Sequence, residues 1–295
     1  MINPLFGTFL TETEPVYDIA VVTEEGAEYW RNSHANHLNN SHSVTKFFIA
    51  SAIGTLYDRG MLSLEDKVTE FFPAKCLPDE MSPVWRDVTV RSVLQHKIGI
   101  EEIPHGIDDD DHDRAAIGED FLRHVFLLKI PHAPGSYYKY SDEAYYLLGR
   151  VIHAVTGLTA DEYMKRTFFD PFGFGQWAMA KCPMGHPLCG GGFFAGSDDV
   201  AKLGWVYAKN GLWHEQRILS EEWIDMAMQE DFACTRFRDT DIFLKTGAKG
   251  QCVAFSRERP AAAAWHGFSN DNGKRNDRLL LGFNRFLDEH FGKRQ

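Results

Sequence analysis

The stretch "NNSHSVTKFFIASAIGTLYDRG" runs from Asn39 to Gly60 and predicts a buried helix, because apolar residues occupy most of it. Its head carries Ser43 and Lys46. Burying an unpaired ammonium is costly, so the lysine needs a chemical reason. Residues three apart share one helix face, and a lysine amine kept neutral by apolar neighbours can take a serine proton. The free N–H groups of a helix N-terminus can also stabilise an oxyanion.

The Ser-x-x-Lys spacing alone does not decide this function. A second match occurs at Ser136 and Lys139. Ser43 could simply cap the helix, and the Lys46 stem could lie along apolar surface with its charge in water. Both interpretations stay open at this point.

Composition narrows the class of protein. The 295 residues are 44% hydrophobic and 25% charged, as in an ordinary globular protein, and the net charge is −11. A strongly acidic chain argues against nucleic-acid partners and against anionic membranes. We find no leader peptide and no apolar run long enough to span a bilayer, and the five cysteines are scattered. We therefore expect a cytoplasmic protein without membrane or nucleic-acid partners.

Strand patterns lie at both ends of the chain and helical patterns lie between them. Residues 16–32 predict a hairpin, residues 250–269 predict two more strands, and residues 276–291 predict a helix. This order predicts an α+β fold: an antiparallel sheet built from N- and C-terminal strands, flanked by helices, with an inserted, mostly helical lobe. We expect one catalytic unit over residues 1–295. Its sheet lobe would cover about 1–60 plus 220–295, and its helical lobe about 61–219.

Two further triplets follow the serine and lysine in order. The first is Tyr140-Ser141-Asp142, and the second is Lys245-Thr246-Gly247. The segments "VTVRSVLQHKIGI" (88–100) and "GGGFFAGSDDVAKLG" (190–204) accompany them. Together these motifs resemble the serine β-lactamase-like superfamily, the group of class C β-lactamases, DD-peptidases and family VIII esterases. The resemblance extends from Asn39 to about Ser269.

The resemblance implies a role for each motif residue and a β-lactamase/transpeptidase-like fold with its active site in a cleft. Ser43 would be the acylated nucleophile, and Lys46 its neighbouring base or proton relay. Tyr140 would exchange protons with the nucleophile, the leaving group and the attacking water. The backbone N–H groups of Ser43 and Ala248 would form the oxyanion hole. The strand with Lys245, Thr246 and Gly247 would line the substrate.

Asp142 departs from the pattern of the superfamily, which has asparagine at this position. An amide both donates and accepts, whereas an ionised carboxylate only accepts. Asp142 would hold Lys46 or Lys245 in the charged form and leave more proton transfer to Tyr140. It also removes a donor that acylamino substrates such as penicillins would use.

We therefore expect a serine hydrolase that acts through an acyl-enzyme on a small ester or amide, without cofactor or metal. Two alternatives stay open. One is a β-lactamase or DD-peptidase, which would act on a lactam or peptide outside the cytoplasm. The other is a non-catalytic binding or sensor protein of the same fold. The sequence leaves the oligomeric state undecided.

Three other features have ordinary structural explanations. Cys182, His186 and Cys189 lie close in sequence, but their spacing fits a turn better than a zinc site. The acidic run at 108–113 lacks the glycine and distal glutamate of a calcium loop, so we expect a solvated loop. His96 matches a position of the superfamily, and we expect it to be a structural histidine with satisfied hydrogen bonds.

Overall fold

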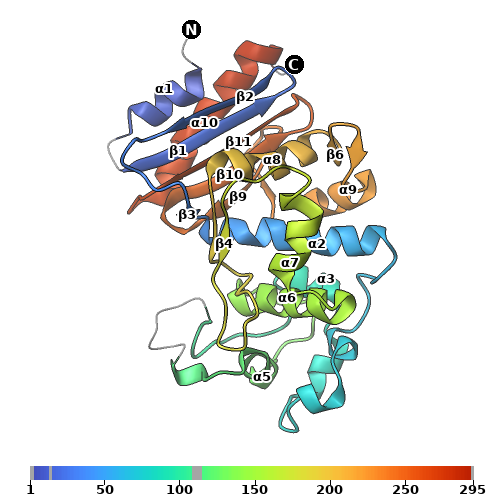
Figure 1. The fold of residues 1–295 in the computed structure, drawn as a ribbon. Helices are drawn as coiled ribbons and strands as arrows, with labels where there is room; N and C mark the ends of the chain where they lie inside the picture. Colours follow the sequence, from blue (N-terminus) through green and yellow to red (C-terminus); the bar gives the residue numbers. More distant parts are fainter. Residues whose placement is uncertain (1–2, 13–14, 108–114, 294–295) are drawn as a thin grey trace. The chain divides into compact units, whose positions relative to one another are not determined.

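The computed structural model describes residues 3–12, 15–107 and 115–293 (Figure 1). The chain folds as two compact units, and each is described by itself. The sheet unit consists of residues 1–44, 168–178 and 193–295, and the helical unit of residues 45–167 and 179–192.

The sheet unit is built on six strands in the order β2-β1-β11-β10-β9-β8. Every neighbouring pair is antiparallel. The strands are β1 (Val16–Thr23), β2 (Gly26–Arg31), β8 (Thr235–Arg236), β9 (Ile242–Gly247), β10 (Gln251–Ser256) and β11 (Ala261–Gly267). The strand from the N-terminal hairpin therefore pairs with the last strand of the chain, which confirms the predicted sheet from both ends.

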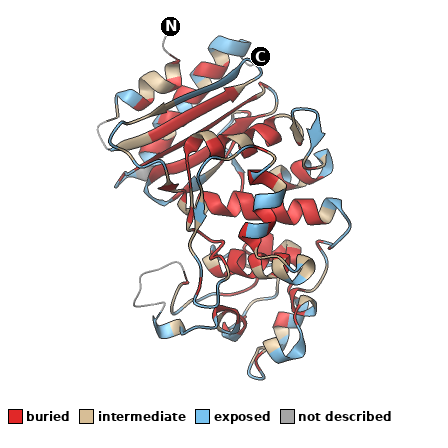
Figure 2. Ribbon diagram, viewed as in Figure 1, coloured by how far each residue is buried: buried red, intermediate tan, exposed pale blue. Residues whose placement is uncertain are grey.

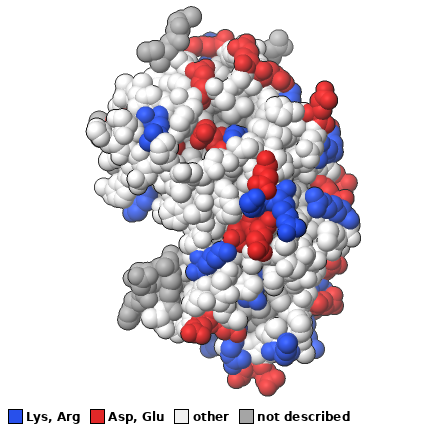
Figure 3. Space-filling model, viewed as in Figure 1, with Lys and Arg blue, Asp and Glu red and all other residues white. Residues whose placement is uncertain are grey.

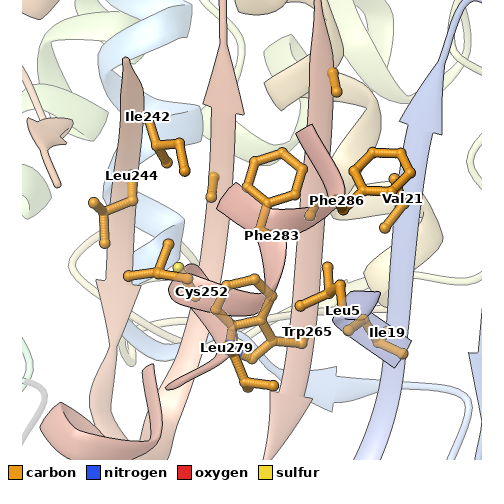
Figure 4. Packing of buried hydrophobic residues seen from close by; sticks show 14 of the residues in the cluster. Leu5, Ile19, Val21, Ile242, Leu244, Cys252, Trp265, Leu279, Phe283 and Phe286 are labelled. Atoms are coloured by element: carbon orange, nitrogen blue, oxygen red, sulfur yellow. The ribbon is translucent and has the colours of Figure 1, made fainter. Parts of the chain in front are cut away.

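Helices cover both faces of this sheet. On one face α1 (Pro4–Leu10) and α10 (Asn272–Phe291) pack together over a buried apolar cluster, which includes Trp265 of β11 and Phe283 of α10 (Figure 4). The other face carries α8 (Ser197–Ala208), which packs on β1, β10 and β11. Side chains alternate between the two faces along a strand, so His266 lies on the face opposite Trp265.

The helical unit is organised around α2 (Thr45–Asp58), whose residues from Thr45 to Leu56 are all buried (Figure 2). It packs against α6 (Asp142–Thr156) and α7 (Ala160–Met164). A helix that is apolar all round must be covered on every side, so α2 forms the core of this unit. The remaining helical segments are η2 (Val68–Phe71), η3 (Ala74–Cys76), η4 (Pro83–Asp87), α3 (Val90–Leu94) and α5 (Phe121–Leu127).

Short elements complete the described chain. They are β3 (Asn39–Asn40), η1 (His42–Val44), η5 (Lys165–Phe169), β4 (Ala178–Met179), β5 (Phe193–Ala195), β6 (Leu212–Trp213), β7 (Gln216–Arg217), α9 (Glu221–Gln229) and η6 (Ala248–Gly250). The helix α9 begins at a side-chain cap, where the Ser220 hydroxyl accepts the N–H of Trp223 at 2.9 Å.

The units divide at different residues from the predicted lobes. The prediction placed residues 45–60 with the sheet, but α2 packs on α6 and α7. It placed residues 193–219 with the helical lobe, but α8 buries its apolar face on the sheet. The reason is that each helix follows the surface that covers its apolar side chains, which chain order alone does not reveal.

The stretch "MLSLEDKVTEFFP" (61–73) carries Ser63 and Asp66 at the spacing of a helix capping pair, which predicts a short helix, but no α-helix begins at Ser63. The side chain of Asp66 does accept the Ser63 N–H at 2.7 Å, as a capping pair would. However, Lys67 forms an isolated antiparallel bridge with Thr89, and Val68 N–H donates to a backbone carbonyl oxygen at residue 88 at 2.9 Å. These bonds hold the chain extended, and only the short 3₁₀ turn η2 follows.

The face of the molecule drawn in Figure 3 has charges of both signs, and the cysteines form no disulfide. Acidic and basic side chains are mixed on the face drawn in Figure 3. All five cysteines carry free thiols. Within residues 3–12, 15–107 and 115–293, no helix combines the length and apolar character that crossing a bilayer requires.

Candidate active site

Ser43 lies in η1, a turn of the sheet unit that backbone and side-chain bonds hold on both sides. The N–H of Ser41 donates to the Phe193 carbonyl at 2.8 Å, and the N–H of His42 donates to Asn40 Oδ1 at 2.8 Å. His42 has φ +46°, a left-handed conformation that is unfavourable for a residue with a Cβ. We call residues 41–44 the nucleophile turn.

The strand end with Lys245, Thr246 and Gly247 lies against this turn in the sheet unit, because η1 packs on β9. A Cβ at Gly247 would stand 2.4 Å from the Ser41 carbonyl oxygen and 3.2 Å from His42 Cβ. Only glycine allows this close approach. The structure therefore brings Ser43 and the second predicted triplet together.

Thr246 is exposed at the end of β9, and the half-buried Lys245 precedes it. Ala248 follows as the first residue of η6 and is also exposed. The next residue, Lys249, has φ +62°, so the backbone turns sharply directly after the triplet. This turn ends β9 and starts the return strand β10.

Lys46 lies in the first turn of α2, in the helical unit, and is completely buried. Its ammonium forms an ion pair with Asp142 and donates to the Gly190 carbonyl at 2.5 Å. The same nitrogen lies 4.7 Å from the ring centroid of Tyr140 and hydrogen-bonds that side chain. The structure thus groups Lys46, Tyr140 and Asp142 as predicted. We call these residues, with His96 and Gly190, the Lys46 cluster.

The Lys46 side chain is an ammonium in this setting. Burial alone would lower the pKa of this amine, but the negative charge of Asp142 and the interaction with Tyr140 outweigh burial and raise the pKa above its ordinary value of 10.5. The first interpretation of the sequence, a neutral lysine that acts as base, therefore does not fit these surroundings. The second expectation, that Asp142 keeps Lys46 charged, agrees with them.

His96 is the residue of this cluster that sequence reasoning undervalued. Its Nδ1 accepts the N–H of Ser141 at 3.2 Å, directly between the two motif residues. Its ring lies tilted against the ring of Tyr140, with centroids 4.5 Å apart, and against the ring of Tyr145 at 5.0 Å. His96 therefore fixes the Tyr140 ring. The signal was present in the segment "QHKIGI", but a sequence does not show what a histidine contacts.

Gly190 was also missed as a site residue. A Cβ on Gly190 would stand 2.5 Å from Asp142 Cβ, so a larger residue would displace that side chain. The glycine lets its carbonyl reach the Lys46 ammonium. The glycine-rich stretch at 190–192 indicated a tight turn, and its function here is close approach.

The second Ser-x-x-Lys match is not part of these sites. Ser136 and Lys139 are exposed, and the Ser136 hydroxyl donates to the Ala133 carbonyl at 2.6 Å. The second Ser-x-x-Lys match is therefore a surface turn. The acidic run at 108–113 lies outside the described residues.

The cysteine and histidine cluster does not form a metal site in the described part of the chain. The Cys182 thiol lies 3.5 Å from the Tyr146 hydroxyl, and the Cys189 thiol donates to the Pro187 carbonyl at 3.3 Å. Both thiols are buried in packing contacts rather than directed at a common point. The turn that the spacing favours is what the structure shows.

The sheet unit has an antiparallel sheet with helices on both faces and a serine turn beside a Lys-Thr-Gly strand, and the helical unit has a buried lysine beside Tyr140. These features are typical of the β-lactamase-fold serine hydrolase family. The family model named Beta-lactamase matches residues 16–286. The chain belongs to this family.

Three relatives illustrate the similarity. Penicillin-binding protein 4 of Amycolatopsis lactamdurans is 28% identical over 144 residues, which are 46% of this chain and 34% of that protein. A penicillin-binding protein homologue from Caulobacter crescentus superimposes with TM-score 0.72 at 16% identity, over 96% of this chain and 95% of that one. A family VIII carboxylesterase superimposes with TM-score 0.75 at 16% identity, over 96% of this chain and 95% of that one.

The chain spans about a third of the length of the curated relatives that it matches. Both solved structures are only 16% identical to this chain, so the similarity to them establishes the fold alone.

Proposed function

We propose that this protein hydrolyses a small ester or amide through an acyl-enzyme formed on Ser43. The observation that carries the proposal is the completely buried Lys46 ammonium, paired with Asp142 and hydrogen-bonded to Tyr140. A buried ion pair is weak evidence for a stabilising role, because its desolvation offsets most of its attraction. A charged lysine against a half-exposed tyrosine is the arrangement that proton transfer needs.

The roles follow from the charge of each group. In the proposed mechanism the Lys46 ammonium would stabilise negative charge on the Tyr140 oxygen, and Tyr140 as a phenolate would take the proton of the Ser43 hydroxyl. The Ser43 oxygen then bonds to the substrate carbonyl carbon, and the bond to the leaving group breaks as Tyr140 returns the proton to it. A water attacks the acyl-enzyme, gives its proton to Tyr140, and Ser43 recovers a proton on release. Backbone N–H groups of Ser43 and Ala248 would hold the oxyanion.

Penicillin binding is the second candidate, and Lys245-Thr246-Gly247 favours it. This triplet ends β9 beside the nucleophile turn, and it belongs to the penicillin-recognising pattern. Asp142 argues for the ester or amide, because its carboxylate is engaged by Lys46 and offers no donor to an acylamino group.

The test is a paired assay on wild type and Ser43→Ala, with p-nitrophenyl esters of increasing acyl length and with nitrocefin. We expect ester turnover in the wild type and a loss of at least about 10³-fold in Ser43→Ala. A fluorophosphonate should add once, on Ser43, as read by mass spectrometry.

Each other outcome selects a different function. Nitrocefin turnover, or a stable penicillin adduct on Ser43, would replace the ester proposal by the lactam one. Identical ester rates in wild type and Ser43→Ala would leave a binding or sensor protein. Ester turnover with no adduct on Ser43 would overturn the acyl-enzyme mechanism.

A further inference from the structure

A series of hydrogen bonds in the order Ser-His-Asp begins at Ser41, two residues before the proposed nucleophile Ser43. The Ser41 hydroxyl lies 3.0 Å from His266 Nε2, and His266 Nδ1 lies 2.8 Å from Asp18 Oδ1. The second carboxylate oxygen of Asp18 accepts the Ser197 N–H at 2.8 Å, at the start of α8. All members lie in the sheet unit. We call Ser41, His266 and Asp18 the buried Ser-His-Asp chain.

This chain has the connectivity of a catalytic triad but not its access. Ser41 and Asp18 are 0% exposed and His266 is 1% exposed. A nucleophile must meet its substrate, so Ser41 cannot be one. Buried polar groups are retained when each finds its partners, and here every member bonds to the next. The chain must therefore serve the structure around it.

The sheet fixes the far end of the chain. Asp18 and His266 face each other across β1 and β11, next to a register shift between Val16 and Asp18. Such a bulge re-aims a side chain relative to regular pairing. With Asp18 also bonded to the N-terminus of α8, His266 is held by three elements of the unit and presents Nε2 to Ser41.

At its other end, the buried Ser-His-Asp chain reaches the nucleophile turn through Ser41. His42, between Ser41 and Ser43, holds φ +46°. A left-handed residue with a Cβ persists only where its surroundings over-determine it, and such strain collects at functional sites. Bonds to Ser41 supply that restraint, through its N–H to Phe193 and its hydroxyl to His266.

We propose that the buried Ser-His-Asp chain positions the Ser43 nucleophile by clamping the strained turn to the sheet. In the tautomer that satisfies both bonds, Nδ1–H donates to Asp18, and Nε2 accepts a hydrogen bond from the Ser41 hydroxyl. The three residues are positioning residues, since none of them touches the reacting atoms. The inference rests on the proposed function of Ser43.

The test compares Ser41→Ala and His266→Leu with wild type by ester kinetics, by the rate of fluorophosphonate addition to Ser43 and by thermal unfolding. A nucleophile displaced by about 1 Å loses about 10- to 100-fold in rate. We expect both variants to lose that factor in kcat and in labelling rate, with KM changed by less than about threefold. His266→Gln, whose amide oxygen can still accept from Ser41, should recover most of the rate.

The matched control is Ser256→Ala. Ser256 is also 0% exposed in the sheet unit, and its hydroxyl donates to Asp241 at 2.5 Å, at the opposite end of β10 from Gln251. It should lower the unfolding temperature as Ser41→Ala does and leave kcat and labelling within twofold.

Two results would overturn the inference while leaving the proposed function intact. One is normal labelling and kcat in Ser41→Ala, and the other is a loss that follows unfolding temperature alone, as in Ser256→Ala. A fluorophosphonate adduct on Ser41 would also overturn it. If the wild type neither turns over ester nor labels at Ser43, the proposed function itself fails, and the positioning role fails with it.

Discussion

Arg259 and Lys46 are both buried beside carboxylates, and they differ in what surrounds them. Arg259 in the sheet unit is 8% exposed, and its guanidinium bonds to Asp241 at 2.9 Å and to Asp288 at 2.6 Å. Lys46 in the helical unit is 0% exposed, and it pairs with Asp142. The carboxylate of Asp241 is 1% exposed, whereas that of Asp142 is 29% exposed.

The difference separates a structural ion pair from a site. The Arg259 fork is saturated by fixed partners that also include Asn284, so it can only hold elements together. The Lys46 ammonium is itself completely buried, but it lies against Tyr140, which is 38% exposed. A buried positive charge next to a solvent-exposed phenol can act, through that phenol, on a molecule that binds from solvent. Burial of the cation is therefore less informative than exposure of its partners.

Replacing the two cations should give opposite phenotypes, and this is the largest effect we expect. Lys46→Met removes the charge that acts on Tyr140, so ester kcat should fall by about 10³-fold. Arg259→Met leaves the buried Asp241 unpaired and should cost about 3–5 kcal/mol of unfolding free energy. Its kcat per folded molecule should stay at the wild-type value.

The measurement is kcat on a p-nitrophenyl ester beside urea unfolding, both at low temperature so that Arg259→Met stays folded. If Lys46→Met retained kcat, the Lys46 cluster would be only structural. If Arg259→Met lost kcat while folded, Arg259 would not be a purely structural residue, and the distinction drawn between it and Lys46 would be wrong.

The hydroxyl groups of Tyr140 and Tyr163 give a second comparison between a site residue and a structural one. Tyr140→Phe removes only the hydroxyl that carries the proton, and we expect kcat to fall by about 10²- to 10³-fold. Tyr163→Phe is the control in the same unit, because its buried hydroxyl bonds Thr55 of α2 at 2.8 Å. That variant should lose about 1 kcal/mol of stability and no activity. Equal kcat losses in the two variants would show that the hydroxyl of Tyr140 has no special role.

The fold and the motif residues were predictable from the sequence because their signals are local. Strand patterns at both chain ends predicted the sheet, and the ordered motifs singled out Ser43, Lys46, Tyr140 and Lys245. That Ser43 and Lys245 belong to one unit and Lys46 to the other was not predicted, because residues 45–60 were expected in the sheet lobe. The positive charge of Lys46 was expected from the carboxylate of Asp142, and the raised pKa of Lys46 agrees with it.

The remaining features depend on distant contacts. Ser41 meets His266 across 225 positions of the chain, and no spacing rule links the two. The clearance at Gly190 and the unit to which α2 belongs likewise depend on what packs there. A glycine-rich or apolar pattern marks such a position but does not name its partner.

Gly190→Ala should disturb the Lys46 cluster without removing any charge. The added Cβ would stand 2.5 Å from Asp142 Cβ, so the ion pair with Lys46 must shift. We expect an intermediate loss of kcat, about 10- to 100-fold. Gly175→Ala is the control, because its Cβ would meet only Asp199 Oδ2 at an ordinary 3.7 Å. Wild-type kcat in Gly190→Ala would mean that the Lys46 and Asp142 pair tolerates displacement.

The smallest effect concerns acid stability and belongs to the structural pair. Burial alone would raise the pKa of Asp241, but hydrogen bonds from Arg259 and Ser256 outweigh it and hold the pKa below its ordinary 3.8. A carboxyl group whose folded pKa is depressed stabilises the fold above its unfolded pKa, and this contribution is lost as the pH falls through the folded value.

Unfolding free energy should therefore fall more steeply below about pH 4 in the wild type than in Asp241→Asn, which has no proton to bind there. Urea midpoints measured from pH 6 to pH 2 give the two slopes. Glu289→Gln, at an exposed position on α10, should run parallel to the wild type. Parallel curves for Asp241→Asn as well would show that the Arg259 pair adds no pH-dependent stability. Its contrast with Lys46 would then rest on activity alone.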